Sequence, residues 1–132
     1  MITGACNCGG VAFEIRAETD SIYCCHCSIC QKWSGAGDVA VIVFPKTALK
    51  WLRGEHLISH WKKPDADWES WFCSTCGSPV PGKNGEDSMF APAGIITSGG
   101  ENLKVAHHIF VGSKASWDVI GDDGQQHHGR IT

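Results

Sequence analysis

Three clusters of cysteine constrain this chain more than any other feature of its sequence. All eight cysteines lie within residues 6–8, 24–30 and 73–76. Two thiolates separated by one or two residues can bind one ion from a single tight turn, and a tetrahedral ion then takes a second pair from elsewhere in the fold. Gly9 and Gly77 directly follow two of the pairs. Glycine allows positive φ there and turns backbone N–H groups toward the sulfurs, so the pattern indicates metal binding.

Two other roles for these cysteines fit the sequence less well. A lone buried cysteine behaves as a small apolar residue, which does not account for three dense clusters. Disulfides persist in oxidising compartments, but residues 1–4 lack the basic start and the apolar core of an export signal. We therefore expect reduced thiols and a cytoplasmic location.

The length and charge of the chain argue against several classes of protein. Its 132 residues fit one domain. The longest apolar run, residues 39–44, is far shorter than the ~20 residues of a membrane helix. A net charge of -3 argues against nucleic-acid binding, which needs clustered lysine and arginine. We expect no membrane or nucleic-acid partner, and the sequence leaves the oligomeric state open.

Short apolar segments separated by glycine-rich or polar stretches predict an all-β domain. The expected strands lie at residues 11–16, 39–44, 57–61, 68–72, 89–93 and 107–111. Residues 28–33 lack helix breakers and are expected to form one short helix. The expected domain covers residues 1–120, and residues 121–132 form a polar C-terminal tail.

Counting possible ligands divides the cysteines into a set of four and a set of three. The four-cysteine set consists of Cys6, Cys8, Cys73 and Cys76. Four thiolates make a closed structural zinc site, although iron also suits them. The three-cysteine set consists of Cys25, Cys27 and Cys30. Three protein ligands with an open fourth position are typical of catalytic zinc; alternatively, Cys24 or His26 completes this second site and closes it.

An open zinc site with three thiolates has distinctive chemistry. Three sulfurs donate much charge, so the ion is a soft and modest Lewis acid that suits a thiol as its fourth ligand. Binding lowers the pKa of that thiol. The resulting thiolate can attack a carbonyl, or leave in the reverse reaction, and water competes for the same position.

The three cysteine motifs resemble those of the glutathione-dependent formaldehyde-activating enzyme family, which includes centromere protein V. They read C-x-C-G at residues 6–9, C-H-C-x-x-C at residues 25–30 and F-C-x-x-C-G at residues 72–77. Weaker matches follow at Gly35 and at residues 93–94, 108–111 and 114–117. One departure is Gln31, which stands before Lys32 where the family often has basic residues.

This resemblance implies a β-tent fold of packed antiparallel sheets. It implies a structural zinc on the four-cysteine set and a second, more labile zinc on the three-cysteine set. The family's named activity is condensation of glutathione with formaldehyde to S-hydroxymethylglutathione, or its reversal. The resemblance therefore implies a zinc-dependent carbon–sulfur lyase that acts on a thiol–aldehyde adduct, with a small-molecule thiol, glutathione being the candidate, as partner.

The alternative function is a non-catalytic zinc-binding structural or protein-interaction module. The fourth position of the second site distinguishes the two, because a pocket there favours catalysis and a fourth side chain or a sealed site favours the module.

Other polar and aromatic residues receive structural interpretations. His26 is expected to turn away from the metal, because neighbouring side chains diverge. We expect His107 and His108 to form a strand pair with one face buried. Trp33 could wall a substrate pocket, but core packing is the favoured interpretation. Asp122 is interpreted as a surface turn residue.

Overall fold

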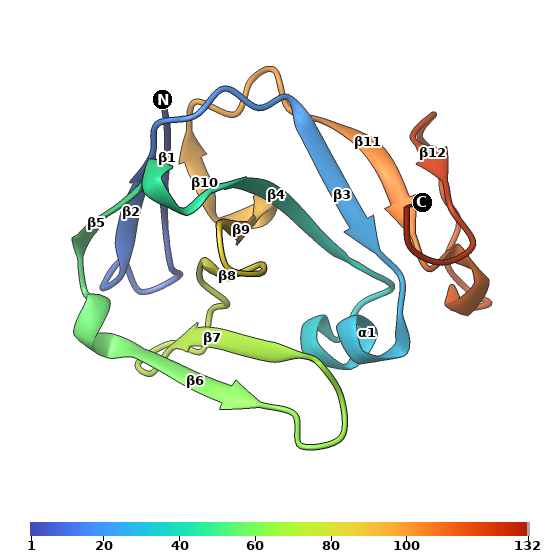
Figure 1. The fold of residues 1–132 in the computed structure, drawn as a ribbon, viewed down its shortest axis with the longest axis horizontal. Helices are drawn as coiled ribbons and strands as arrows, with labels where there is room; N and C mark the ends of the chain where they lie inside the picture. The colour runs from blue at the N-terminus through green and yellow to red at the C-terminus, as the bar shows by residue number, and fades with distance from the viewer. Residues whose placement is uncertain (132) are drawn as a thin grey trace.

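The structure is a computed structural model, and it describes residues 1–131. Within this range the chain consists of short strands in three sheets and one α-helix, which confirms the all-β prediction (Figure 1). The strands are β1 (Ile2–Ala5), β2 (Ala12–Ile15), β3 (Ser21–Cys25), β4 (Val39–Pro45), β5 (Leu49–Arg53), β6 (Ile58–Lys62), β7 (Glu69–Cys73), β8 (Gly82–Lys83), β9 (Ser88–Pro92), β10 (Ile96–Ser98), β11 (Lys104–Ile109) and β12 (Gln125–Gln126). The helices are α1 (Ser28–Ser34) and the short 3₁₀ turns η1 (Lys46–Ala48), η2 (Glu55–Leu57), η3 (Ala93–Ile95) and η4 (Val111–Ser113).

The first sheet has the strand order β10-β1-β2-β5, and the second has the order β12-β11-β3-β4-β9-β8. The third is the antiparallel hairpin β6–β7. In Figure 1 this hairpin runs along the lower edge, and α1 lies beside the loop that joins its two strands. Most pairings are antiparallel, but β11 pairs in parallel with β3 and with β12.

The strand β12 comes from the segment predicted to be a polar tail. It extends the second sheet by placing Gln125 beside His107 and Gln126 beside His108. Backbone hydrogen bonds continue this contact, because the N–H of His127 donates to the carbonyl of His108 at 2.8 Å. Part of the tail is therefore packed against the domain in the structure.

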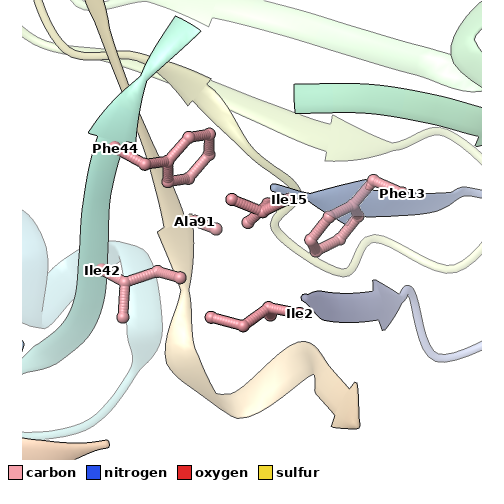
Figure 2. Close-up of a cluster of buried hydrophobic side chains, with 6 residues drawn as sticks. All are labelled: Ile2, Phe13, Ile15, Ile42, Phe44 and Ala91. Carbon is pink, nitrogen blue, oxygen red and sulfur yellow. The ribbon is translucent and has the colours of Figure 1, made fainter. Parts of the chain in front are cut away.

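The main hydrophobic core lies between the first and second sheets (Figure 2). The first sheet contributes Ile2, Phe13 and Ile15, and the second contributes Ile42, Phe44 and Ala91. Burying side chains of this size stabilises a fold by about 1.5–3 kcal/mol each. The side chains of Ile42 and Phe44 point from one face of β4 into this core, since alternate residues of a strand share a face.

The helix α1 begins and ends where local chemistry sets its limits. Cys27 caps its start, with its sulfur accepting from the backbone N–H of Cys30 at 3.3 Å. Gly35 ends it in the left-handed region at φ 70°, where glycine avoids a steric penalty. The predicted helix at residues 28–33 is thus confirmed.

Among the helices of residues 1–131, none has both the length and the apolar character that crossing a bilayer requires.

Candidate metal centres

The four cysteines predicted to form a closed set lie together, with their sulfur atoms all within 4.8 Å of one another. They come from the turn between β1 and β2 and from the end of β7 and the turn after it, so this set joins the first sheet to the hairpin. Gly9 and Gly77 adopt φ values of 78° and 77° in the two turns, as the sequence indicates. Val11, Val80 and Leu57 pack around the set and shield it.

Backbone N–H groups and the Ser78 hydroxyl form hydrogen bonds with three of these sulfurs. The backbone N–H of Val11 donates to Cys6 Sγ at 3.2 Å, and that of Gly10 donates to Cys8 Sγ at 3.4 Å. A hydrogen bond with the Ser78 hydroxyl, followed by the Ser78 backbone N–H, lowers the pKa of Cys76 to about 5. Clustered thiolates with N–H donors behind them are the surroundings in which soft metals are held.

The three-cysteine set is also assembled, from one short segment. Cys25 is the last residue of β3, Cys27 caps α1, and Cys30 lies in the first turn of α1. Their sulfur atoms lie within 4.8 Å of one another. A hydrogen bond from the Cys30 thiol lowers the pKa of Cys25 to about 6. Both cysteine sets could hold a metal ion, and their all-sulfur donors fit zinc.

All eight cysteines are free thiols in the structure, as a metal-binding role requires. Cys24 does not belong to the three-cysteine set, because it points to the opposite face of β3 from Cys25 and lies with Asp38 and His108 instead. Burial, followed by the nearby Asp38 carboxylate, raises the pKa of Cys24 to about 12, which keeps this thiol protonated.

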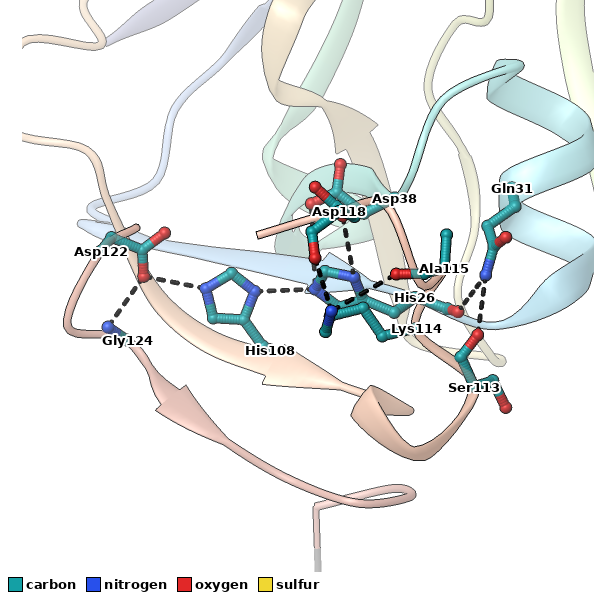
Figure 3. Close-up of polar contacts among 10 residues, drawn as sticks. All are labelled: His26, Gln31, Asp38, His108, Ser113, Lys114, Ala115, Asp118, Asp122 and Gly124. Carbon is teal, nitrogen blue, oxygen red and sulfur yellow. Dashed lines mark hydrogen bonds and ion pairs between the residues drawn. The ribbon is translucent and has the colours of Figure 1, made fainter. Parts of the chain in front are cut away.

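His26 is turned away from the cysteines, as predicted from its position. Its side chain is 1% exposed. Its Nε2 lies 2.8 Å from Nδ1 of His108, and Nε2 of His108 lies 2.8 Å from Oδ1 of Asp122 (Figure 3). The backbone N–H of Gly124 donates to the same Asp122 oxygen at 2.8 Å. The hydrogen bond from His108, followed by that of Gly124, lowers the pKa of Asp122.

We refer to Asp122, His108 and His26 as the His–Asp chain. The buried face predicted for the strand pair is confirmed at His108, and the surface position predicted for Asp122 is confirmed too, but the hydrogen bond between the two residues was not predicted. Asp122 reaches His108 because the segment after β11 folds back and pairs with that strand. The His–Asp chain links this segment to the turn that carries Cys25 and Cys27.

Gln31 links the same parts of the molecule. Its side-chain amide donates to the carbonyl of His26 at 2.8 Å and to the carbonyl of Ser113 at 3.0 Å (Figure 3). A basic side chain could donate there but would bring a charge to a neutral pair of carbonyls. The glutamine that departs from the family pattern therefore has a structural role in tying α1 to η4.

A cavity of about 460 Å³ opens beside the three-cysteine set. Cys25 and Cys30 line it, together with Trp33 and with residues of β4, β7 and β9. The favoured interpretation of Trp33 as a core residue is wrong, because its ring is part of the cavity wall. None of the four-cysteine set lines this cavity.

The fold and these sites define a β-rich protein with two cysteine sets, each able to hold a metal ion, one of them beside a cavity. The family model described as glutathione-dependent formaldehyde-activating enzyme matches residues 1–113, and the chain belongs to that family. A crystal structure of a Rhodobacter sphaeroides protein is similar, with a TM-score of 0.58 at 21% identity. The similarity covers 70% of this chain and 85% of that one, and it shows a shared fold.

Proposed function

We propose that this protein is a zinc-dependent carbon–sulfur lyase that forms or cleaves the adduct of a small thiol and an aldehyde. Formation of S-hydroxymethylglutathione, or its reversal, is the founding reaction of this type in the family to which the chain belongs. In cleavage the adduct's hydroxyl loses its proton, the carbonyl forms, the C–S bond breaks and its electron pair leaves on sulfur. Formation follows the same steps in reverse.

The observation that carries the proposal is the cavity beside the three-cysteine set. Two sulfurs of that set, from Cys25 and Cys30, line a space large enough for a small molecule. Neither Cys24 nor His26 lies where it would complete the set, since both take part in contacts elsewhere. A purely structural module would instead present a fourth ligand or a sealed site.

The two cysteine sets have different proposed roles. Zinc bound by the three-cysteine set would lower the pKa of a substrate thiol and favour its thiolate at neutral pH. The four-cysteine set would hold a structural zinc that fastens the hairpin β6–β7 to the first sheet. Because the four-cysteine set is partly buried among Val11 and Val80, its ion would exchange more slowly than the ion of the three-cysteine set.

The rim of the cavity carries charges that suit glutathione. Lys83 and Arg130 are exposed cations at the rim, and Asp67 and Glu69 supply carboxylates there. Glutathione has two carboxylates and one ammonium group, so each of its charged groups would find an opposite charge at the rim. The chain's residues would thereby orient the thiol with its sulfur toward Cys25 and Cys30.

NMR exchange spectroscopy with glutathione and ¹³C-formaldehyde tests this proposal, because it measures adduct formation and cleavage at equilibrium. We expect catalytic amounts of the zinc-loaded protein to accelerate exchange above the uncatalysed rate, and Cys27→Ser to abolish the acceleration. A protein with both sites loaded that accelerates neither this exchange nor that of any other thiol–aldehyde pair would favour the non-catalytic module.

A further inference from the structure

Part of the cavity lining is apolar, and this apolar surface begins with β4. Ile42 and Phe44 on one face of this strand fill the main core. Val39, Val41 and Val43 on its other face line the cavity. A strand that is apolar on both faces is expected where both faces are covered. Here the second face borders the hollow beside the three-cysteine set, and the half-buried Val41 and Val43 present apolar surface to it.

Aromatic rings from three separate elements form the walls of the same hollow. Trp33 of α1 packs edge-to-face against Trp68 at 5.3 Å and against Phe90 of β9 at 6.2 Å between ring centroids. Trp71 of β7 lies 6.2 Å from the Phe90 ring. These contacts fix the rings relative to one another before any ligand arrives. The walls therefore form a preorganised slot for a flat apolar group.

Four charged residues also line the cavity, and three of them are exposed while Glu69 is half-buried. Asp67, Lys83 and Arg130 are exposed, and the two cations and two carboxylates of the rim balance each other. A thiol such as glutathione places its charged groups at the rim and only one methylene next to its sulfur. Formaldehyde adds a single carbon to that sulfur. An adduct of these two would leave the valines and the aromatic walls without a partner.

We infer that the apolar part of the cavity binds the aldehyde portion of the adduct, and that this aldehyde carries an aryl or similarly bulky apolar group. This inference rests on the proposed function. The reaction is unchanged: the thiolate adds to the carbonyl carbon of the aryl aldehyde, the C–S bond forms and the oxygen takes a proton, and cleavage reverses these steps. The difference lies in the ring, which the slot between Trp33, Trp71 and Phe90 would enclose.

Two thiols that differ by a ring test the inference directly. The full-length protein is loaded with Co²⁺, whose absorption spectrum reports a change in coordination, and is titrated with phenylmethanethiol or with ethanethiol. Phenylmethanethiol places a ring one carbon from sulfur, as an aryl aldehyde adduct does. We expect it to bind at least about tenfold more tightly than ethanethiol, because its ring is buried among apolar and aromatic side chains.

The two thiols also differ in acidity, but this difference is the same for every protein variant. A change in the affinity ratio between variants therefore reports contact with the ring. Val43→Thr keeps the shape of the side chain and adds a hydroxyl to the apolar surface, and Trp33→Leu removes a wall. Each should lower the ratio of the two affinities by about threefold or more. Trp117→Leu is the matched control, because Trp117 is 69% exposed and does not line the cavity. Metal content and circular dichroism verify that each variant is folded.

The outcomes distinguish this inference from the function on which it rests. If both thiols change the spectrum with equal affinity, or if the ratio is the same in Val43→Thr and Trp33→Leu as in the wild type, the aryl specificity is wrong and the lyase proposal stands. If neither thiol changes the spectrum, the three-cysteine set has no position for a thiol, and the proposed function fails as well.

Discussion

The imidazole Nε2 of His26 lies 2.8 Å from Nδ1 of His108, and both rings are buried. This contact joins the turn that carries Cys25 and Cys27 to β11, which is far away in the sequence. His26 also places its Nδ1 where it has no hydrogen bond among the described residues, 3.8 Å from the Asp118 carboxylate. Among residues 1–131, the one hydrogen bond that the His26 ring makes is therefore the one to His108.

Removing the His108 imidazole should destabilise the protein. His108→Ala leaves the buried Nε2 of His26 without a partner, and an unsatisfied buried polar atom costs about 1–3 kcal/mol. Urea unfolding measures the loss. His56→Ala, at an exposed position, is the control and should change stability by less than about 0.5 kcal/mol. Equal losses in the two variants would show that the His–Asp chain does not support the fold.

The charge of Asp122 should contribute stability that depends on pH. Its pKa in the folded protein is lowered by the hydrogen bond from His108, relative to an unfolded value of about 3.9. A lowered carboxyl pKa stabilises the fold above the unfolded value, and this contribution is lost as the pH falls through the folded value. Asp122→Asn should therefore be less stable than the wild type at pH 7, and the difference should shrink below about pH 4. A difference in urea midpoint that is constant with pH would contradict this account.

Gly82 lies against the ring of Trp71, one of the cavity walls. A Cβ at this position would overlap the ring, so Gly82→Ala should force Trp71 to move and destabilise the protein by about 1–3 kcal/mol. Tryptophan fluorescence should also shift. Gly94→Ala is the matched control, because its added Cβ meets no atom within 4 Å. If Gly82→Ala were as stable as Gly94→Ala with unchanged fluorescence, the close packing of Trp71 would be wrong.

Cys24 should be dispensable for metal binding. Its thiol lies outside both cysteine sets and stays protonated at neutral pH, with a pKa of about 12. Cys24→Ser should therefore retain the metal content and the glutathione–formaldehyde exchange activity of the wild type. Elemental analysis of the purified variant checks the first statement. Loss of one ion per chain would place Cys24 among the ligands of the second site.

Much of the fold followed from local patterns. Residues 39–44 and 89–93 are apolar runs bounded by breakers, and they form β4 and β9 within a residue of the predicted limits. Strands β1, β3, β5, β8, β10 and β12 were not predicted, and β3 (Ser21–Cys25) shows why. Its sequence Ser-Ile-Tyr-Cys-Cys shows no alternation of apolar and polar residues, and it is extended between two neighbouring strands, β4 and β11.

The candidate site was predictable in its ligands and not in its surroundings. Close spacing specified the three-cysteine set and the pairs Cys6/Cys8 and Cys73/Cys76, because a tight turn brings such sulfurs together, and counting ligands then joined the two pairs. The cavity depends on Trp33 and Trp71, which line it together because both pack against Phe90 of β9. The same holds for Asp122, whose partner His108 is set by the path of the chain after β11. Contacts between distant segments of this kind leave no local pattern in the sequence.

Metal stoichiometry under challenge with a chelator tests the central claim most directly, namely that one cysteine set is closed and the other is open to a substrate thiol. Elemental analysis should find two zinc ions per chain. The chelator should release one of them early, glutathione should slow that release, and Cys27→Ser should lack this ion. The other ion should be retained in Cys27→Ser and lost from Cys76→Ser together with much of the thermal stability. One tightly held ion per chain, or two ions released together with no effect of glutathione, would contradict the claim.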